Sequence, residues 1–239
     1  MTTYVLVHGG GHGGWCWQKI ATRLRAAGHE VHTPTLTGLG ERSHLMGPDV
    51  GLDTHITDVV NLICFEGLND MILGGHSYGG MVITGVADRV PEHIRRLVYL
   101  DAAHPANGQS LADVTPSLMG MARSMGQVIN GVELVLLPME GAGRFYGVED
   151  DADVAWMDKR LTAHPWKSFE DKLRLTDERR LRQIPRANIN CIPTMDPDDT
   201  ESHARQRDGD RNYEIETGHD LMITEPDKVA AILLELADV

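Results

Sequence analysis

The chain has 239 residues, of which 41% are hydrophobic and 24% are charged, and its formal net charge is −13. This composition is typical of a soluble globular protein, and the length suits one large α/β domain. The negative charge argues against a nucleic-acid partner and against an anionic membrane surface.

The cysteines and the lengths of the apolar runs indicate the cellular compartment. Cys16, Cys64 and Cys191 are odd in number and widely scattered, so they predict neither a disulfide framework nor a Cys-x-x-Cys metal site. No basic leader precedes the first strand, and no apolar run reaches 18 residues. We therefore expect a cytoplasmic protein without a membrane span.

The first strand, 4–8, runs into the glycine loop 9–14 and then a helix over 15–27. Gly-x-Gly-x-x-Gly after a strand also occurs in dinucleotide-binding folds, which place an acidic residue at the end of the second strand. Here that strand, 30–34, ends in threonine and proline. We therefore expect no nucleotide cofactor.

The same loop suits the binding of an oxyanion, because a bare backbone N–H can approach a reacting carbonyl closely. By its position Gly10 is the candidate donor. His8 and His12 have the spacing of a zinc pair, but that spacing shares a face only on a helix. We therefore expect no metal, and we expect His12 to brace the loop.

A nucleophile elbow is predicted where an apolar strand beginning at Met71 gives way to a helix. Gly75 and Gly79 flank Ser77 at positions where a tight turn leaves no room for a Cβ. The turn strains Ser77 and exposes its hydroxyl at the N-terminus of the helix. The N–H of Tyr78 is the second candidate oxyanion donor.

Strands and helices alternate through the first hundred residues, which indicates a mainly parallel sheet with helices on both faces. The strand 95–101 ends in Asp101, so that Gly10, Ser77 and Asp101 all follow strand ends. From 105 to 184 strand signals nearly vanish, except near 133–137. We predict a helical cap over 105–184, inserted in a core of 1–104 and 185–239.

Methionines are frequent in this predicted cap, where they could line an adaptable apolar pocket or simply pack the cap onto the core. They are Met119, Met121, Met125, Met139 and Met157. We expect helices near 109–128, 149–163 and 166–175.

Sheet pattern returns at 187–192 and 213–215, and His219 lies on the loop after the last strand. Its place after Ser77 and an acid fits the serine–acid–histidine order of α/β-hydrolases.

The motifs Val5-Leu6-Val7-His8-Gly9, Gly75-His76-Ser77-Tyr78-Gly79 and Gly218-His219 resemble the α/β-hydrolase superfamily. They resemble in particular the branch of plant methylesterases of the salicylate-binding protein 2 type, hydroxynitrile lyases and bacterial carboxylesterases. The resemblance implies an α/β-hydrolase fold. Lyases of this branch carry a threonine and a lysine where Gly9 and Asp220 stand here. Without that lysine, no positive charge stabilises the cyanide ion as it leaves. An esterase is favoured.

The acid of the triad departs from the plant pattern. The resemblance places it at Thr194, which cannot carry the charge, while Asp196 and Asp198 stand nearby in an acidic loop. Some superfamily members carry the acid after the strand that Asp101 ends. We predict Asp101, with Asp196 as the alternative.

Together these features predict a serine carboxylic-ester hydrolase that acts on small, largely apolar methyl or aryl esters through an acyl-enzyme, without cofactor or metal. Ser77, His219 and Asp101 would form the triad. Lyase-like chemistry, cofactor-free oxygenation with a histidine–aspartate pair and low-turnover ligand binding stay open. The assembly, monomer or homodimer, stays open.

Overall fold

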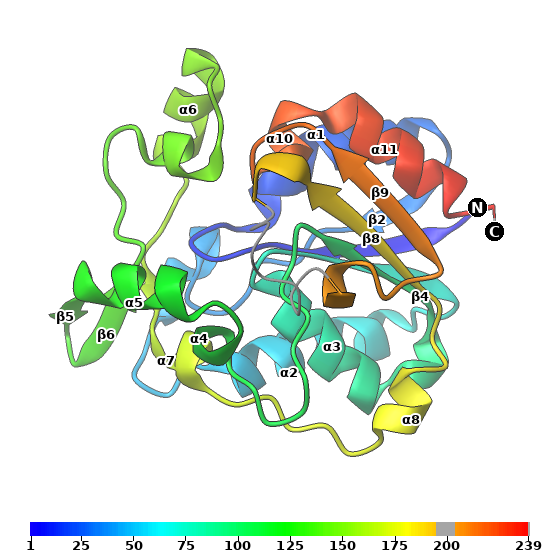
Figure 1. Cartoon of the computed structure of the whole chain (residues 1–239), viewed down its shortest axis with the longest axis horizontal. Coiled ribbons are helices and arrows are strands. Elements are labelled where there is room, and N and C mark those ends of the chain that lie inside the picture. Colours follow the sequence, from blue (N-terminus) through cyan, green and yellow to red (C-terminus); the bar gives the residue numbers. More distant parts are fainter. Residues whose placement is uncertain (195–203, 239) are drawn as a thin grey trace.

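The chain forms an α/β sandwich around one parallel sheet, described by a computed structural model over residues 1–194 and 204–238 (Figure 1). The six strands lie in the order β2-β1-β3-β4-β8-β9, and every neighbouring pair is parallel. The strands are β1 (Thr3–Val7), β2 (Glu30–His32), β3 (Met71–His76), β4 (Ile94–Leu100), β8 (Arg186–Cys191) and β9 (Arg211–Ile215). The expected mainly parallel α/β architecture is confirmed.

Both faces of the central strands are buried, because a layer of helices packs on each face and side chains alternate between the two. In β1, Val5 and Val7 belong to the apolar cluster under one helical layer, whereas Tyr4 and Leu6 belong to the cluster under the other. The first layer holds α2 (Leu52–Glu66) and α3 (Gly79–Arg89). The second holds α1 (Gln18–Ala26), α10 (Leu221–Thr224) and α11 (Pro226–Glu235), on the opposite side of the sheet (Figure 1).

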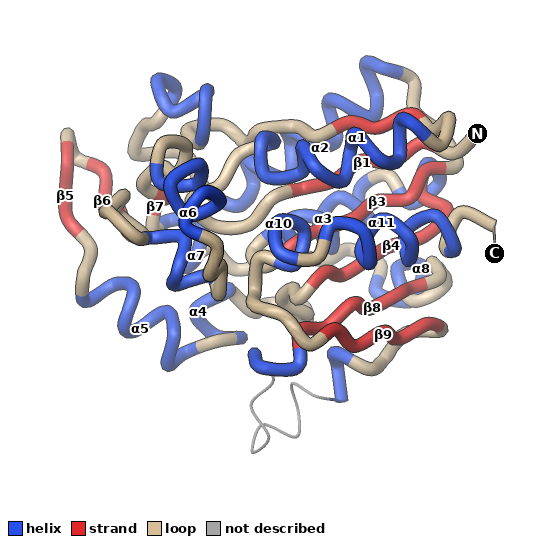
Figure 2. Tube along the Cα trace, turned by 90° about the horizontal axis from the view of Figure 1, so that it is seen from above, coloured by secondary structure: helices blue, strands red, loops and turns tan. Residues whose placement is uncertain are grey.

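Apart from its last part, which holds the helix over 178–181 and lies near the start of β8, the segment 105–184 gathers at the end of the sheet opposite the two termini (Figures 1 and 2). Since β1 starts at the N-terminus, this is the end at which the parallel strands finish. Its helices are α4 (Leu111–Val114), α5 (Pro116–Ser124), α6 (Asp151–Asp158), α7 (Lys167–Glu170) and α8 (Glu178–Leu181). These helices are shorter than we expected.

The segment also contains a second sheet that the sequence analysis did not predict. Its strands, β5 (Gln127–Ile129), β6 (Val132–Val135) and β7 (His164–Pro165), pair antiparallel. Asn130 and Gly131 join the first two with positive φ at both residues, which suits a two-residue hairpin turn. The helix expected to reach residue 128 was therefore wrong at its C-terminal end.

The cap methionines do not share one environment. Met119 and Met157 are buried in the two apolar clusters, which fits packing of the cap onto the core. Met121, Met125 and Met139 are each more than half exposed. The expected pocket lined by methionines is not formed by these three side chains.

Candidate active site

The turn between β3 and α3 has the strained geometry that the elbow pattern predicts. Ser77 has a φ of 54°. A Cβ on Gly75 would lie 2.6 Å from the carbonyl oxygen of Gly79, and a Cβ on Gly79 would lie 2.8 Å from that of Val7. Both approaches are too close for any side chain, so the steric requirement for glycine is confirmed.

This close approach has a measurable consequence. We expect Gly79→Ala to lower the free energy of unfolding by about 1–3 kcal/mol, since the turn must move away from the backbone of β1. Urea denaturation followed by circular dichroism measures the change. Gly120→Ala is the matched control, because a Cβ there in α5 meets no atom within 4 Å and alanine favours a helix. A Gly79→Ala midpoint equal to that of the wild type would contradict the steric argument.

His219 and Asp101 lie together beside this turn. The Nδ1 atom of His219 is 2.5 Å from Oδ2 of Asp101. The buried Asp101 carboxylate also accepts hydrogen bonds from the N–H of Cys191 at 3.0 Å and from the Thr194 hydroxyl at 2.8 Å. Thr194, the position at which plant relatives place the acid, therefore supports the carboxylate of Asp101. The alternative acid, Asp196, lies outside the described residues.

Burial and charge act against each other on this pair. Burial alone would raise the pKa of Asp101, but the hydrogen bond and charge of His219 lower it below its ordinary 3.8. Burial alone would lower the pKa of His219. The hydrogen bond and charge of Asp101, together with the charge of Asp220, raise it above 6.5.

The two backbone N–H groups predicted to bind an oxyanion flank Ser77. Tyr78 directly follows it at the start of α3, and a Cβ on Gly9 would lie 2.8 Å from the Cβ of Ser77, which brings the glycine loop against the serine. Within residues 1–194 and 204–238, the N–H groups of Gly10 and Tyr78 and the Ser77 hydroxyl form no hydrogen bond. These three groups can therefore bond to a bound molecule.

Three histidines hold the glycine loop in place. Nδ1 of His8 donates to the carbonyl of Gly9 at 2.9 Å, and Nδ1 of His12 donates to that of Gly10 at 2.7 Å. The N–H of Gly11 donates to Nδ1 of His164 at 3.1 Å. The expectation that His12 braces the loop is confirmed. Each of these three rings also has a second hydrogen-bond partner.

Asp220 is completely buried behind this loop, where its Oδ2 lies 2.9 Å from Nε2 of His12. The sequence did not predict this placement, in which the side chain of the residue after His219 turns into the protein. No local pattern could reveal the contact, because its partners lie near opposite ends of the chain.

Cap side chains that the sequence analysis did not single out meet the glycine loop. Leu136 and Phe169 lie where a Cβ on Gly10 would contact them at 2.9 and 3.0 Å. The ring of Tyr146 stacks on that of His219, with 6.4 Å between centroids and 18° between planes. The surface that these side chains offer beside Ser77 is largely apolar.

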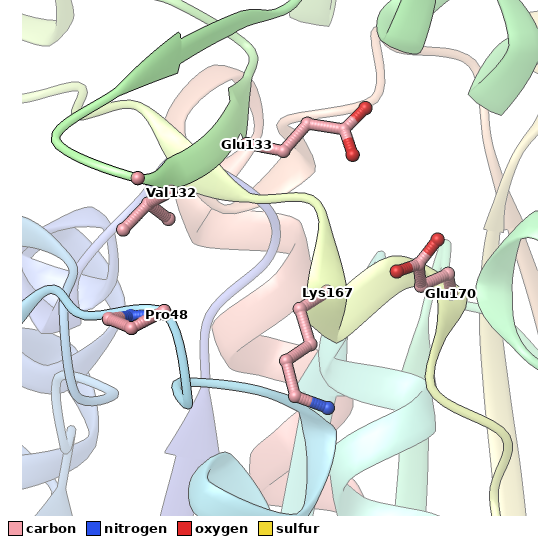
Figure 3. Close-up of a pocket in the computed structure, with 6 residues that line it drawn as sticks. Pro48, Val132, Glu133, Lys167 and Glu170 are labelled. Carbon is pink, nitrogen blue, oxygen red and sulfur yellow. The ribbon is translucent and has the colours of Figure 1, made fainter.

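A separate pocket of about 290 Å³ lies between the cap and the loop that carries Pro48 (Figure 3). Pro48, Val132, Glu133, Lys167 and Glu170 line it together with Gly131. None of the predicted site residues is among them. Both of its carboxylates already pair with Arg123 within the cap.

Sequence comparison agrees with this geometry. The profile of the alpha/beta hydrolase family matches residues 4–232.

The chain belongs to the α/β-hydrolase family.

This α/β-hydrolase is 39% identical to the carbendazim hydrolyzing esterase of Nocardioides sp. (strain SG-4G), over 99% of this chain and the whole of that one. The full-length likeness makes it an esterase, an enzyme that cleaves ester bonds.

Two solved structures superpose on the whole α/β-hydrolase. An extracellular alpha/beta-hydrolase from a Paenibacillus species, described as sharing structural and functional homology with tobacco salicylic acid binding protein 2, gives a TM-score of 0.81 at 28% identity, covering 98% of each chain. The methylesterase MES16 from Arabidopsis gives 0.81 at 23% identity, covering 100% of this chain and 99% of that one, and shows the shared fold. No helix within 1–194 or 204–238 is long and apolar enough to cross a bilayer.

Proposed function

We propose that this esterase hydrolyses small, largely apolar esters of methyl or aryl type through an acyl-enzyme on Ser77. The observation that carries the proposal is the hydrogen-bonded pair of the buried Asp101 and the partly exposed His219, beside a serine strained into a positive φ. Strain of this kind is expected where a nucleophile must be exposed.

The reaction would follow two steps of acyl transfer. His219 accepts the Ser77 proton at Nε2 while the hydroxyl oxygen attacks the ester carbonyl, and Asp101 keeps Nδ1 protonated and stabilises the imidazolium. The N–H groups of Gly10 and Tyr78 bind the oxyanion, each worth about 3–4 kcal/mol in comparable enzymes. The alcohol leaves with the proton from His219. Water then cleaves the acyl-enzyme with His219 as the base.

The apolar side chains near the glycine loop support the substrate class. Leu136 and Phe169 offer aliphatic and aromatic surface, but no cation, to an acyl or alcohol group. A lyase would need a positive charge to stabilise the departing cyanide ion, whereas position 220 carries a carboxylate that is already paired with His12. Carbendazim, which the Nocardioides relative hydrolyses by its name, is a candidate substrate.

We expect hydrolysis to lose activity in acid, with a limb in kcat/KM above pH 6.5. His219 must be neutral to accept a proton, and its pKa is raised by Asp101 and Asp220 against the effect of burial. The contribution of His219 to the free energy of unfolding changes with pH in the opposite direction to the activity. A raised folded pKa stabilises the fold below the unfolded value of 6.5, and this contribution is lost as the pH rises through the folded pKa. A pH–rate profile together with urea unfolding measures both, and an acid limb below pH 6.5 would contradict the assignment.

A fluorophosphonate probe tests the proposal directly, because it phosphonylates only an activated serine. The expected result is one label per chain, located on Ser77 by peptide mass spectrometry and prevented by prior denaturation. Failure to label folded protein would overturn the acyl-enzyme mechanism. Panels that vary the acyl and alcohol halves separately, with carbendazim included, would then narrow the substrate. Oxygen consumption with an aromatic substrate would instead support the oxygenase alternative.

The compartment and the assembly complete the proposal. We propose a cytoplasmic enzyme, supported by the free thiols of Cys16, Cys64 and Cys191, although the Paenibacillus relative is extracellular. Cell fractionation distinguishes a cytoplasmic from an extracellular location. A homodimer is supported by the edge strand β5, where Val128 is 72% exposed, and light scattering tests it.

A further inference from the structure

A buried line of hydrogen bonds connects the residue after His219 to the glycine loop. Oδ2 of Asp220 contacts Nε2 of His12 at 2.9 Å, and Nδ1 of the same ring contacts the carbonyl of Gly10 at 2.7 Å. Both side chains have no exposed surface. The line therefore joins the predicted base loop to the predicted oxyanion loop through the protein interior.

His12 has a hydrogen-bond acceptor on each side of its ring. Nδ1 lies opposite the carbonyl oxygen of Gly10, and Nε2 lies opposite the carboxylate of Asp220. Such a buried contact is costly to break, because removing His12 takes this hydrogen bond from a carboxylate that has no exposed surface. Among the described residues, Oδ1 of Asp220 accepts no hydrogen bond, and it lies 3.6 Å from Nε2 of His76.

The glycine loop needs such a constraint. Consecutive glycines rotate their peptide planes at little cost, and a rotated plane would turn the Gly10 N–H away from the oxyanion. His8 holds the carbonyl of Gly9, in the same peptide as that N–H, and His12 holds the carbonyl of the next peptide. The two planes that flank the Cα of Gly10 are thus both anchored.

We propose that His12 and Asp220 are positioning residues that together hold the Gly10 carbonyl and so keep the Gly10 N–H directed at the oxyanion. The proposal rests on the proposed acyl-transfer function, and neither side chain touches the substrate. It also assigns a use to the carboxylate after the base, which the triad leaves unexplained.

The same carboxylate acts on the base through its charge. Asp220 faces His12 from the glycine loop, His76 from β3, Cys16 from the short turn Gly14–Trp17 before α1, and Tyr146 from the cap. His219 in turn faces Asp101 at the end of β4, His76 and Tyr146. Because the charge of Asp220 helps to raise the pKa of His219, neutralising it moves the acid limb of kcat/KM to lower pH.

Four variants of the full-length enzyme test the proposal with one ester substrate. We expect His12→Phe and Asp220→Leu each to lower kcat by about 10²-fold with KM within about threefold, since the oxyanion is bound mainly in the transition state. Asp220→Asn keeps a hydrogen-bond partner for the ring, so it should restore most of that rate while still moving the acid limb. The double variant His12→Phe/Asp220→Leu should be no slower than the slower single variant.

Asp210→Asn is the matched control, because it removes an ion pair to the buried Arg96 on β4 without reaching the glycine loop. It should change the unfolding midpoint and leave kcat unchanged. Additive losses in the double variant, or kcat within twofold of the wild type in all four variants, would overturn the proposal. If instead Ser77→Ala retains turnover, the acyl-transfer function itself fails, which the same assay distinguishes. Asp220→Asn keeps the test valid should Asp220→Leu not fold.

Discussion

Replacing Ser77 by alanine is expected to lower kcat for ester hydrolysis by about 10⁶-fold while the protein stays folded. The hydroxyl oxygen is the atom that would form the acyl bond, and alanine lacks it. The remaining groups can still polarise a bound ester, so a small residual rate should persist. Steady-state assays at high enzyme concentration, with circular dichroism as the check on folding, measure the loss.

Ser124→Ala is the matched control for this prediction, because that serine is exposed at the end of α5 and its hydroxyl donates to the carbonyl of Met121. Its kcat should equal that of the wild type. Retention of more than a few per cent of activity in Ser77→Ala would remove the serine mechanism. Unchanged oxygen uptake with an aromatic substrate in that variant would favour cofactor-free oxygenation.

The parts of the site that the sequence predicted are those that depend on local geometry. A strand followed by Gly-x-Ser-x-Gly leaves one way to turn, so the strain at Ser77 and the need for Gly75 follow from the sequence alone. Likewise, parallel strands end at one edge of a sheet. Their alternation with helices therefore placed Asp101 at the same edge as Ser77 and made it the favoured acid over Asp196, and its carboxylate does contact His219.

The parts that the sequence did not predict depend on contacts between distant segments. Asp220 meets His12 only because the two ends of the chain pack on the same face of the sheet. The support that Thr194 gives to Asp101 also needs the register of β4 against β8. The cap hairpin is different, since Asn130-Gly131 was a usable turn signal that the helical interpretation overlooked.

Asp101→Asn is expected to lower kcat by about 10⁴-fold, by analogy with other triads. The asparagine side chain keeps the volume and would donate its amide hydrogen to Nδ1 of His219. The proton would then move to Nε2, the atom that must accept the proton of Ser77. In the wild type the 2.5 Å hydrogen bond to Asp101 fixes the tautomer with the proton on Nδ1. In the variant the hydrogen bond to asparagine would fix the other tautomer, which cannot accept the serine proton. Steady-state kinetics above the acid limb measure the loss.

Two further variants decide between the candidate acids. Asp196→Asn should leave kcat within a fewfold of the wild type, and a loss of about 10⁴-fold there would show that the acid was assigned to the wrong residue. Thr194→Asp in the Asp101→Asn background should recover at least about tenfold in kcat, because the Thr194 hydroxyl already lies 2.8 Å from the Asp101 carboxylate. Recovery would mean that the acid can act from either of two adjoining strand ends, as long as the carboxylate is buried against the imidazole. The constraint on the triad would then be the position of the charge in space, and the strand that carries it would be secondary.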